Sequence, residues 1–590
     1  MKKQILTIAA FFLLVISCKD YLNEEHVSGI GYSYYNTESG IEDLVRSAYV
    51  PLRTFGGTNA GLKISCHGTD IWESTNVADG NEFQKYTSAL NSATAVLNTV
   101  WSDFYLGISR CNIAINRIPN ISGTQFLLTD TGKKQRMGEV KFLRAYYYFI
   151  LVQQFGKIPL MLEENISVLN EMKRANVADI YNAIIADLRF ASDYLPATQS
   201  ETARPTQSAA QHLLAKVYLT RGSAITEARG QKGTDMDSSA YYAEKVVQYK
   251  GSLLSDYNDA RKQTNENNKE VLFAVQYAKN LLYNASSDIN RNLSHFFYTM
   301  QYMTIGGLTL DINYGQAWVR LRPTDYFYDL YDLKNDSRFY KTFKTTWLSN
   351  HTGTIPKWSA TDAPSPDLIG KNKFGLGDTA LYFTMNTNAT DQQITSKPYT
   401  WRPRNKFTDR VYPQYQYHLD PNRTTAGDSN GTLDFKLMWL SETYLIAAEA
   451  YGRKGDYAKA ADYINIVRRR AAYKEGEIKP KQTYTFDGVA IADISKSTEK
   501  QMEITIDKIN SFEKLRDFIL EERAREFCGD NERFFDLTRT ETFYDRIVKY
   551  NKFAPEGIKQ WHKLRPIPQN HIDRLANAGP LSEEQNEGYY

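Results

Sequence analysis

The amino-acid sequence predicts a mainly α-helical protein, in which tetratricopeptide-like helical hairpins form a scaffold that carries a large irregular insert of loops and short strands. Three observations lead to this prediction. Apolar residues recur at helical spacing near both ends of the chain, two distant stretches share a hairpin pattern, and the segment between them has little helical periodicity. With 590 residues, the chain exceeds the roughly 250–300 residues that one hydrophobic core usually serves, so two domains or an elongated solenoid are expected.

The N-terminal segment, residues 1–17, has the layout of an export signal. Two lysines precede a short apolar run, which is too short for a membrane span of about 20 residues, and a small residue and Cys18 follow. Residues 15–18 resemble a bacterial lipobox, in which the cysteine thiol receives a diacylglycerol group, so we expect a lipoprotein signal peptide that is cleaved before Cys18. The alternative is an ordinary secretory signal with an incidental cysteine. In the lipobox interpretation, residues 18–40 form a lipidated tether.

We expect an N-terminal helical region over residues 41–278. The apolar spacing predicts its first helix over 41–52, and the Gly-, Asn-, Thr- and Ser-rich residues 54–95 are expected to form a long loop. Further helices are predicted over about 94–118, 139–155 and 177–194. The helix over 139–155 is apolar nearly all round, which is typical of a helix that is buried on every side.

Two stretches carry the spacing of tetratricopeptide-like helical hairpins. They have small residues where helices cross, a glycine at the turn, and tyrosine followed by alanine on the second helix. The first stretch begins at Ala215 and ends at Val246, and the second begins at Ala447 and ends at Ala460. Two clear copies are fewer than the three or more that a regular array needs, so we expect an irregular solenoid.

Two further regions complete the expected organisation. Residues 279–432, called the insert below, are rich in Gly, Asn, Asp, Pro and Thr, and are expected to form loops and short strands. Aromatic residues are scattered through the insert. Residues 433–590 are expected to form a C-terminal helical region, with helices over 434–453, 457–472 and 512–528.

Composition excludes some classes of function. Lys and Arg number 71 and Asp and Glu 68, so the net charge is only +3 and nothing predicts nucleic-acid binding. No stretch after the export signal reaches membrane-spanning length. Besides Cys18, three scattered cysteines make no disulfide scaffold, and at most one bridge joins two of Cys66, Cys111 and Cys528. The 41 tyrosines suit wet, amphipathic surfaces, where a ring packs and a hydroxyl makes hydrogen bonds.

The sequence offers no catalytic or metal-binding set. Residues 427–431 match the Gly-x-Ser-x-Gly pattern around Ser429, but a nucleophile elbow needs a preceding strand and a following helix, whereas the preceding residues are typical of a loop. The histidines are dispersed, and Cys66 and His67 are neighbours without further ligands nearby. We therefore expect no enzymatic activity, no cofactor and no metal centre, although the sequence leaves open whether a calcium ion orders the insert.

Five blocks, which follow one another in order along the chain, resemble the SusD/RagB family. Residues 138–149 and the turn after them are similar to its signature helix, and residues 521–539 are similar to its most distinctive element. The other blocks lie at 101–112, at 440–450, and at 564–568 with the ending 586–589. Two departures stand out: Lys157 occupies a position where the family commonly has Asp, and Cys528 and Asp530 lie in a segment that is usually small or acidic.

The resemblance implies a fold, a location and a role. Members of the family are mainly helical, with tetratricopeptide-like helix pairs that support an irregular ligand-binding half. They are lipoproteins on the outer face of the outer membrane in Bacteroidota, where they form a lid over a SusC-like TonB-dependent transporter and capture a nutrient, usually an oligosaccharide. We therefore expect a surface-exposed, lipid-anchored SusD-like protein that binds a glycan and delivers it to such a transporter.

The resemblance also implies where the ligand binds. In the family, ligand contacts come from the loop before the first long helix and from the insert, and no strict motif marks single positions. A sugar site needs a flat aromatic side chain beside amide, carboxylate or arginine groups. The candidates with this chemistry are Asp70, Trp72, Asn76 and Asn81 in the first loop, and Tyr314, Trp318, Trp347 and Trp358 in the insert. For each tryptophan of the insert, packing is the competing interpretation.

Three other functions stay open at this point. A RagB-like member of the family that captures peptides would also use a tyrosine-rich cleft. A surface hydrolase would need a nucleophile, for which Ser429 is the candidate. A purely structural scaffold for the transporter would need no ligand-binding residues at all.

Overall fold

The computed structural model describes residues 32–74, 80–121, 129–165, 170–278, 280, 291–385, 387, 389–477 and 496–590. The export signal, Cys18 and the first part of the expected tether lie outside these residues. The 3₁₀ helix η1 (Tyr32–Asn36) precedes the first α-helix, α2 (Glu38–Ala48). The side-chain oxygen of Thr37 accepts a hydrogen bond from the backbone N–H of Gly40, and this cap starts α2 before the position that the apolar spacing predicts.

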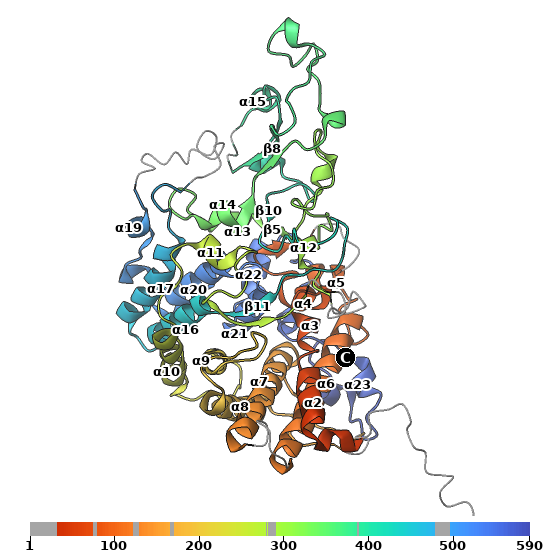
Figure 1. Cartoon of the computed structure of the whole chain (residues 1–590), viewed down its shortest axis with the longest axis vertical. Coiled ribbons are helices and arrows are strands. Elements are labelled where there is room, and N and C mark those ends of the chain that lie inside the picture. The colour runs from red at the N-terminus through yellow and green to blue at the C-terminus, as the bar shows by residue number, and fades with distance from the viewer. Residues whose placement is uncertain are drawn as a thin grey trace, which may run out of the picture.

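Five helices of the N-terminal half pack in chain order and form the lower part of the molecule in Figure 1. They are α6 (Ala95–Arg117), α7 (Asp130–Phe155), α8 (Val177–Tyr194), α9 (Gln207–Gly222) and α10 (Asp235–Lys250). Each helix contacts the next one along the chain, as antiparallel helix pairs do. The first predicted helical hairpin is confirmed as the pair of α9 and α10.

The helix α7 packs between α6 and α8 in this stack. From Gly138 onward nearly all of its residues are buried, so the prediction of a helix that is buried on every side is confirmed. Its buried charge is paired: the guanidinium of Arg144 lies 2.7 Å from the carboxylate of Asp187 and donates to Asn112 Oδ1 at 2.8 Å. Gly156 ends α7 with a φ of +68°, in the left-handed region that favours glycine.

A second set of helices continues the stack. The helices α16 (Leu440–Arg453) and α17 (Tyr457–Ala471) form the other predicted hairpin. The helix α16 packs against α10, although the whole insert separates them in the sequence. Next come α20 (Phe512–Glu526), which packs on α16, and α21 (Arg533–Arg539). The helix pairs before and after the insert therefore form one continuous scaffold.

Two strands mark where the insert leaves and rejoins this scaffold. They are β4 (Val271–Val275) and β11 (Phe435–Trp439), which pair antiparallel with Val275 opposite Phe435. The chain therefore leaves the scaffold and returns to it at neighbouring points. In Figure 1 the insert rises from this pair to the top of the molecule.

The insert holds small sheets and short helices. The strands β7 (Thr346–Leu348), β8 (Thr379–Thr384) and β9 (Thr400–Pro403) form a three-stranded sheet with β8 in the centre. The strand β6 (Phe343–Lys344) pairs with β10 (Gln414–Tyr415). The short helices and 3₁₀ turns are α12 (Ser294–Phe297), η5 (Tyr302–Thr304), α13 (Asp325–Asp329), α14 (Arg338–Thr342), η6 (Thr352–Thr354), η7 (Pro366–Leu368), α15 (Asp391–Thr395) and η8 (Arg404–Lys406).

Shorter elements connect these parts. Those in the N-terminal half are α3 (Leu52–Phe55), α4 (Asn59–Ser65), β1 (Trp72–Glu73), α5 (Asn81–Lys85), η2 (Ile118–Asn120), the paired strands β2 (Ile158–Pro159) and β3 (Arg174–Ala175), and α11 (Tyr257–Arg261). Those in the C-terminal part are α19 (Glu499–Met502), η9 (Ile506–Lys508), α22 (Phe543–Tyr550), η10 (Gln560–Lys563), α23 (Gln569–Ile572) and α24 (Leu581–Glu584).

The expectation of a long loop over residues 54–95 is wrong. The segment contains α4, β1 and α5, and many of its residues are buried. The helix α4 begins because the side-chain oxygen of Thr58 accepts a hydrogen bond from the backbone N–H of Gly61. Small and polar residues therefore serve here as caps of short, buried elements, which composition alone does not distinguish from a loop.

The insert does not pack as a separate lobe. One of its hydrophobic cores joins insert residues such as Phe327 to scaffold residues, among them Leu62, Trp72 and Ala524. A second core lies wholly within the insert and contains Trp347. The lower half of the insert is therefore fixed to the scaffold, and the upper half packs on itself.

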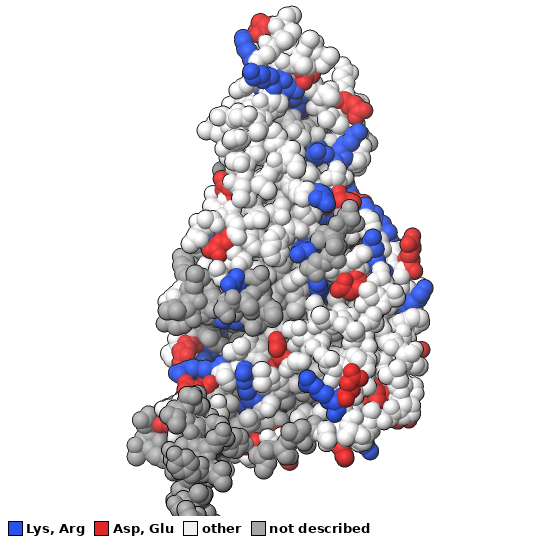
Figure 2. Space-filling view, turned by 90° about the vertical axis from the view of Figure 1, so that its right-hand side faces the viewer, with Lys and Arg blue, Asp and Glu red and all other residues white. Residues whose placement is uncertain are grey.

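The surface carries charges of both signs. Figure 2 shows a face on which Lys and Arg are interspersed with Asp and Glu, and on which broad uncharged areas cover the insert. This distribution agrees with the small net charge of +3. No helix in the described part of the chain has the length and apolarity that crossing a membrane requires.

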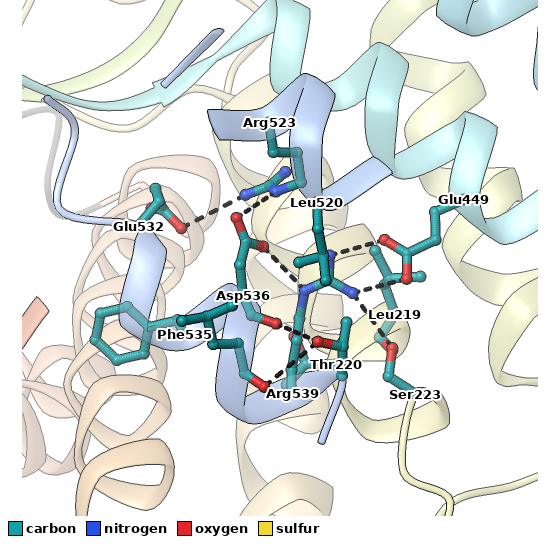
Figure 3. Close-up of polar contacts among 12 residues, drawn as sticks. Leu219, Thr220, Ser223, Glu449, Leu520, Arg523, Glu532, Phe535, Asp536 and Arg539 are labelled. Atoms are coloured by element: carbon teal, nitrogen blue, oxygen red, sulfur yellow. Dashed lines mark hydrogen bonds and ion pairs between the residues drawn. The ribbon is translucent and has the colours of Figure 1, made fainter. Parts of the chain in front are cut away.

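Buried ion pairs tie the C-terminal helices together (Figure 3). Arg523 on α20 lies 2.7 Å from Asp536 on α21, and Asp536 lies 3.1 Å from Arg539. The guanidinium of Arg539 donates to both carboxylate oxygens of Glu449 on α16, at 2.8 and 2.7 Å. Charged residues of the block 521–539, which resembles the most distinctive element of the SusD/RagB family, thus join three helices of the scaffold.

Candidate ligand-binding site

The two regions that are predicted to bind ligand meet in the fold. The strand β1 pairs antiparallel with β5 (Arg322–Pro323), and Trp72 lies opposite Pro323. The strand β1 belongs to the segment before α6, and β5 belongs to the insert. Candidate residues that are far apart in the sequence are therefore brought to one part of the molecule.

Asp70 and Trp72 are buried, so the expectation that they are exposed loop residues is wrong. The carboxylate of Asp70 lies 2.6 Å from Arg533 and 2.9 Å from Arg546. Burial would raise the pKa of Asp70, but these two guanidinium groups outweigh it and hold the pKa below its usual value. Trp72 is fully buried, and its indole N–H donates to the backbone carbonyl of Cys528 at 2.7 Å. Both side chains hold β1 against the C-terminal part.

Of the two asparagines in the same segment, the structure describes only Asn81. Asn76 lies outside the described residues. Asn81 is the first residue of α5, and its side chain is exposed. Of the four candidates in this segment that the sequence predicts, only Asn81 presents a side chain to solvent within the described part of the chain.

Tyr314 and Trp347 do come together, on either side of a lysine. Lys344 Nζ lies 4.8 Å from the ring centroid of Tyr314 and 5.6 Å from that of Trp347. Trp347 is fully buried, and burial lowers the pKa of Lys344. The hydroxyl of Tyr314 donates to the carbonyl of Leu348 at 3.0 Å. This cluster packs the upper half of the insert, and Trp347 has no surface to offer a ligand.

Trp358 lies in the arm of residues 352–378, which forms the top of the insert. Its backbone N–H donates to the carbonyl of Lys371 at 2.9 Å, and Lys373 Nζ lies 4.7 Å from its ring centroid. The side chain is nearly buried. For Trp358, as for Trp347, the structure gives a packing role to a residue that we predicted as a ligand contact.

Among the three candidate tryptophans of the insert, Trp318 is the one that is only half-buried, as Tyr314 also is. The ring of Trp318 stacks on Phe296, with the centroids 4.5 Å apart and the planes 28° from parallel. The guanidinium carbon of Arg320 lies 5.3 Å from the ring centroid of Trp318. An indole face beside a cation and near solvent combines the apolar and polar groups that a shallow ligand site needs.

The backbone between these two side chains is strained. Val319 has a φ of +51°, which is a rare conformation for a β-branched residue. Its backbone N–H donates to the carbonyl of Thr299 at 3.3 Å, and the N–H of Arg320 donates to the carbonyl of Phe297 at 2.9 Å. These bonds hold the turn in place, so the positions of Trp318 and Arg320 are fixed by the chain around α12. Backbone strain of this kind is concentrated at functional sites.

A rigid loop supports the same aromatic pair. The guanidinium carbon of Arg423 lies 5.3 Å from the ring centroid of Phe296, and its Nη1 donates to the carbonyls of Ala426 and Asp428 at 2.8 Å. The carboxylate of Asp428 accepts from Asn430, which closes the loop further. Phe296 and Arg423 were missed by the sequence prediction, although the aromatic run over 296–298 could have indicated the first of them.

A polar groove of about 330 Å³ lies between α11 and the insert. Its lining includes four amide side chains, a tyrosine and a lysine, namely Asn258, Gln263, Asn313, Gln416, Tyr417 and Lys262. Amide groups offer both donors and acceptors, which suits ligands that carry several hydroxyl groups. Asn313 is the neighbour of Tyr314, so the segment 313–320 contributes both to this groove and to the stacked tryptophan.

The described residues hold no catalytic set of the kinds considered above. Ser429 follows a loop, and β11 rather than a helix comes after it, so the context of a nucleophile elbow is missing. Its Oγ accepts a hydrogen bond from Arg291 Nη1 at 2.8 Å. In the described part of the chain, no three His, Cys, Asp or Glu side chains gather in a way that could hold a metal ion. The thiols of Cys66, Cys111 and Cys528 are free and buried.

A helical scaffold, an irregular insert fixed to it, a half-buried tryptophan beside an arginine, and an amide-lined groove are features that suit a ligand-binding protein. The family model described as "SusD family" matches residues 269–589, and the one described as "Starch-binding associating with outer membrane" matches residues 20–219. The chain therefore belongs to the SusD family, and the resemblance seen in the sequence is confirmed. As a member of this family of binding proteins it is not an enzyme.

Individual relatives agree with this assignment. The SusD-like protein P2 of Formosa agariphila is 23% identical over the full length of both chains, and a SusD-like protein of Bacteroides ovatus is 29% identical over 83% of this chain and 79% of its own. Among solved structures, a laminarin-binding SusD-like protein superimposes with a TM-score of 0.62 at 20% identity, covering 94% of this chain and all of the other. This likeness confirms the predicted fold.

Proposed function

We propose that the protein binds an oligosaccharide at the surface formed by Trp318, Arg320 and the amide-lined groove, and delivers it to a SusC-like TonB-dependent transporter. In this proposal the mature chain is anchored in the outer membrane through lipid on Cys18 and faces the outside of the cell. Three features support the glycan as ligand: the stacked, accessible tryptophan, the four amide side chains, and the similarity to a laminarin-binding SusD-like protein.

The stacking of Trp318 on Phe296 is the observation that carries the proposal. Sugar rings present apolar C–H faces that are surrounded by hydroxyl groups. The indole offers a flat apolar face for the ring, while Arg320 and the amides of the groove offer partners for the hydroxyls. Phe296, Arg423 and the strained turn at Val319 hold the indole in place, so a ligand meets a preorganised surface and loses less free energy in ordering it.

The test is calorimetric binding of laminarin oligosaccharides and a panel of other neutral glycans and peptides. Trp318→Ala should weaken glycan binding by about tenfold or more, because an aromatic contact of about 1–3 kcal/mol is lost. Tyr241→Ala, which removes an exposed aromatic side chain from α10, is the matched control and should bind like the unaltered protein. Binding of peptides alone would replace the sugar by a peptide ligand, and unchanged glycan binding in Trp318→Ala would refute this surface as the site.

Anchoring and delivery are tested separately. Cys18→Ala protein should fold and bind ligand in solution, but it should be lost from the cell surface when it is expressed in a Bacteroidota host. The unaltered protein, extracted from outer membranes in mild detergent, should co-purify with a TonB-dependent transporter. Retention of Cys18→Ala at the surface would contradict the lipid anchor, and recovery without any transporter would contradict the delivery role.

A further inference from the structure

A cleft outside the insert lies on the helical scaffold. It has a volume of about 930 Å³, which is enough for a ligand of several rings. The end of α7, the β2–β3 hairpin, the ends of α9 and α21, and the C-terminal residues 577–587 form its walls. None of its lining residues belongs to the insert, so it is separate from the surface around Trp318.

One wall of the cleft is cationic. It is formed by Lys157, Lys173 and Arg174 of the β2–β3 hairpin. Among the residues that the structure describes, neither lysine has an ion-pair partner. The guanidinium of Arg174 donates only to uncharged acceptors, which are the carbonyls of Lys157 at 2.8 Å and Glu583 at 3.2 Å and the side-chain oxygen of Asn586. Among the described residues, these three positive charges line the cleft with no carboxylate within ion-pair distance, although Glu584 is near enough to Arg174 to interact with it electrostatically. Lys157 is the residue that departs from the common family pattern.

The C-terminal side of the cleft is acidic, and it adjoins the cationic side, because Arg174 donates to the carbonyl of Glu583 and to Asn586. Glu583, Glu584 and Glu587 line the C-terminal side. Tyr181 at the start of α8 also lines the cleft. Its side chain is only 2% exposed, and its hydroxyl has no hydrogen-bond partner in the described part of the chain. A simple polyanion would be repelled by the carboxylates, whereas a ligand with one acidic group and several hydroxyls satisfies both walls.

We propose that this cleft is a second binding site, which takes an acidic sugar such as a short uronide. Its carboxylate is held by Lys157, Lys173 and Arg174, and its hydroxyls donate to the carboxylates of the C-terminal segment and accept from Tyr181. The choice of a sugar as ligand rests on the proposed glycan-binding function. The cleft itself, its charges and the partnerless tyrosine are independent of that function.

The experiment measures binding of a galacturonate trimer and of its carboxyl-reduced form, which differs only in charge. The double variant Lys157→Ala/Lys173→Ala should weaken uronide binding about tenfold to a hundredfold, because charge-assisted hydrogen bonds of about 1.5–3 kcal/mol are lost. Tyr181→Phe should weaken it several-fold. Lys357→Ala, at an exposed lysine of the insert, is the matched control and should change nothing. The carboxyl-reduced trimer should not bind at the cleft.

The Trp318→Ala variant distinguishes binding in this cleft from binding at the surface around Trp318. Uronide binding should persist in Trp318→Ala, while neutral glycan binding is lost. Loss of uronide binding in Trp318→Ala but not in the lysine double variant would overturn the second site and leave the first intact. Equal binding of the carboxyl-reduced trimer, equal binding of an oligoglutamate peptide, or no uronide binding at all would also overturn it. If no neutral glycan binds the unaltered protein, the proposed function fails, whatever the uronide does.

Discussion

The carboxylate of Asp70 lies 2.6 Å from the guanidinium of Arg533, although the two are 463 positions apart in the chain. This ion pair joins the segment before the first long helix to α21 in the C-terminal part. Arg546 on α22 approaches the same carboxylate at 2.9 Å. The contact gives Asp70 a structural role that its residue type did not reveal.

Replacing Asp70 by Asn should destabilise the protein and leave ligand binding by the folded fraction unchanged. The substitution leaves the buried guanidinium of Arg533 without a carboxylate and leaves Arg546 with Asp517 alone, at 3.7 Å. Breaking a buried ion pair of this kind costs about 3–5 kcal/mol. Urea unfolding followed by tryptophan fluorescence measures the change. The control is Asp367→Asn, which breaks an exposed pair with Lys371 and should shift the free energy of unfolding by less than about 0.5 kcal/mol. A stable Asp70→Asn protein that no longer binds glycan would instead make Asp70 a ligand contact.

Gly107→Ala should destabilise the protein, although alanine is the better helix former. A Cβ at this position of α6 would lie 2.6 Å from the ring of Tyr147, which is itself fully buried and has no room to move. Overpacking of this kind costs about 1–3 kcal/mol and exceeds the gain in helix propensity. Thermal unfolding monitored by circular dichroism measures the difference. Gly233→Ala, where a Cβ meets nothing within 4 Å, should melt like the unaltered protein.

The free energy of unfolding should decrease in acid, because the carboxylate of Glu449 becomes protonated. Burial would raise the pKa of its carboxyl, but Arg539 and Arg453 outweigh burial and lower the pKa to about 2. Because the folded-state pKa lies below the ordinary value of 4.5, the stabilisation is complete above about pH 4.5 and is lost as the pH falls toward 2. It amounts to about 3 kcal/mol at most.

The Glu449→Gln variant isolates this contribution. It should be less stable than the unaltered protein at pH 6, and the difference in unfolding free energy should shrink as the pH falls toward 3. Urea titrations of both proteins across this range measure the difference. A difference that stays constant with pH would show that the ion pair does not stabilise the fold in the way the geometry implies.

The three buried thiols should resist modification until the protein unfolds. Burial raises the pKa of Cys66 to about 12 and that of Cys111 and Cys528 further, so little thiolate is present at pH 8. Ellman's reagent added to the Cys18→Ala protein should therefore report almost no reactive thiol in buffer and three in denaturant. Rapid labelling of the native protein would contradict the burial of these side chains.

Much of the scaffold could be predicted because its signals are local. The apolar run of α7 and the small residues of the two hairpins each lie within a few turns of helix, so a short stretch of sequence is enough to predict how these helices pack. The elements that assemble the site are different. A pair of two-residue strands such as β1 and β5 leaves no periodicity to detect, yet it helps to bring Trp72 beside the insert.

The exposure of the candidate site residues could not be predicted from local sequence either. Trp318 and Trp347 lie in segments of similar composition, yet one is accessible and the other is fully buried. The difference arises because the side chain of Trp347 packs in the core of the insert against residues such as Phe383, whereas Trp318 lies beside the strained turn at Val319. Residue type predicted which side chains are suited to a ligand, and only the fold shows which of them reach solvent.

The pairing of β4 with β11 has a consequence for how such a protein diversifies. Because the two ends of the insert are fixed side by side, the entropy of closing the intervening chain rises only slowly with its length. Loops can therefore lengthen, shorten or be exchanged without changing the register of the helices below. The lower half of the insert, which shares a core with Leu62 and Ala524, is the part that must be kept in any such exchange. The upper half has its own core around Trp347, so it is the part that can be exchanged to change ligand specificity while the helical scaffold stays the same.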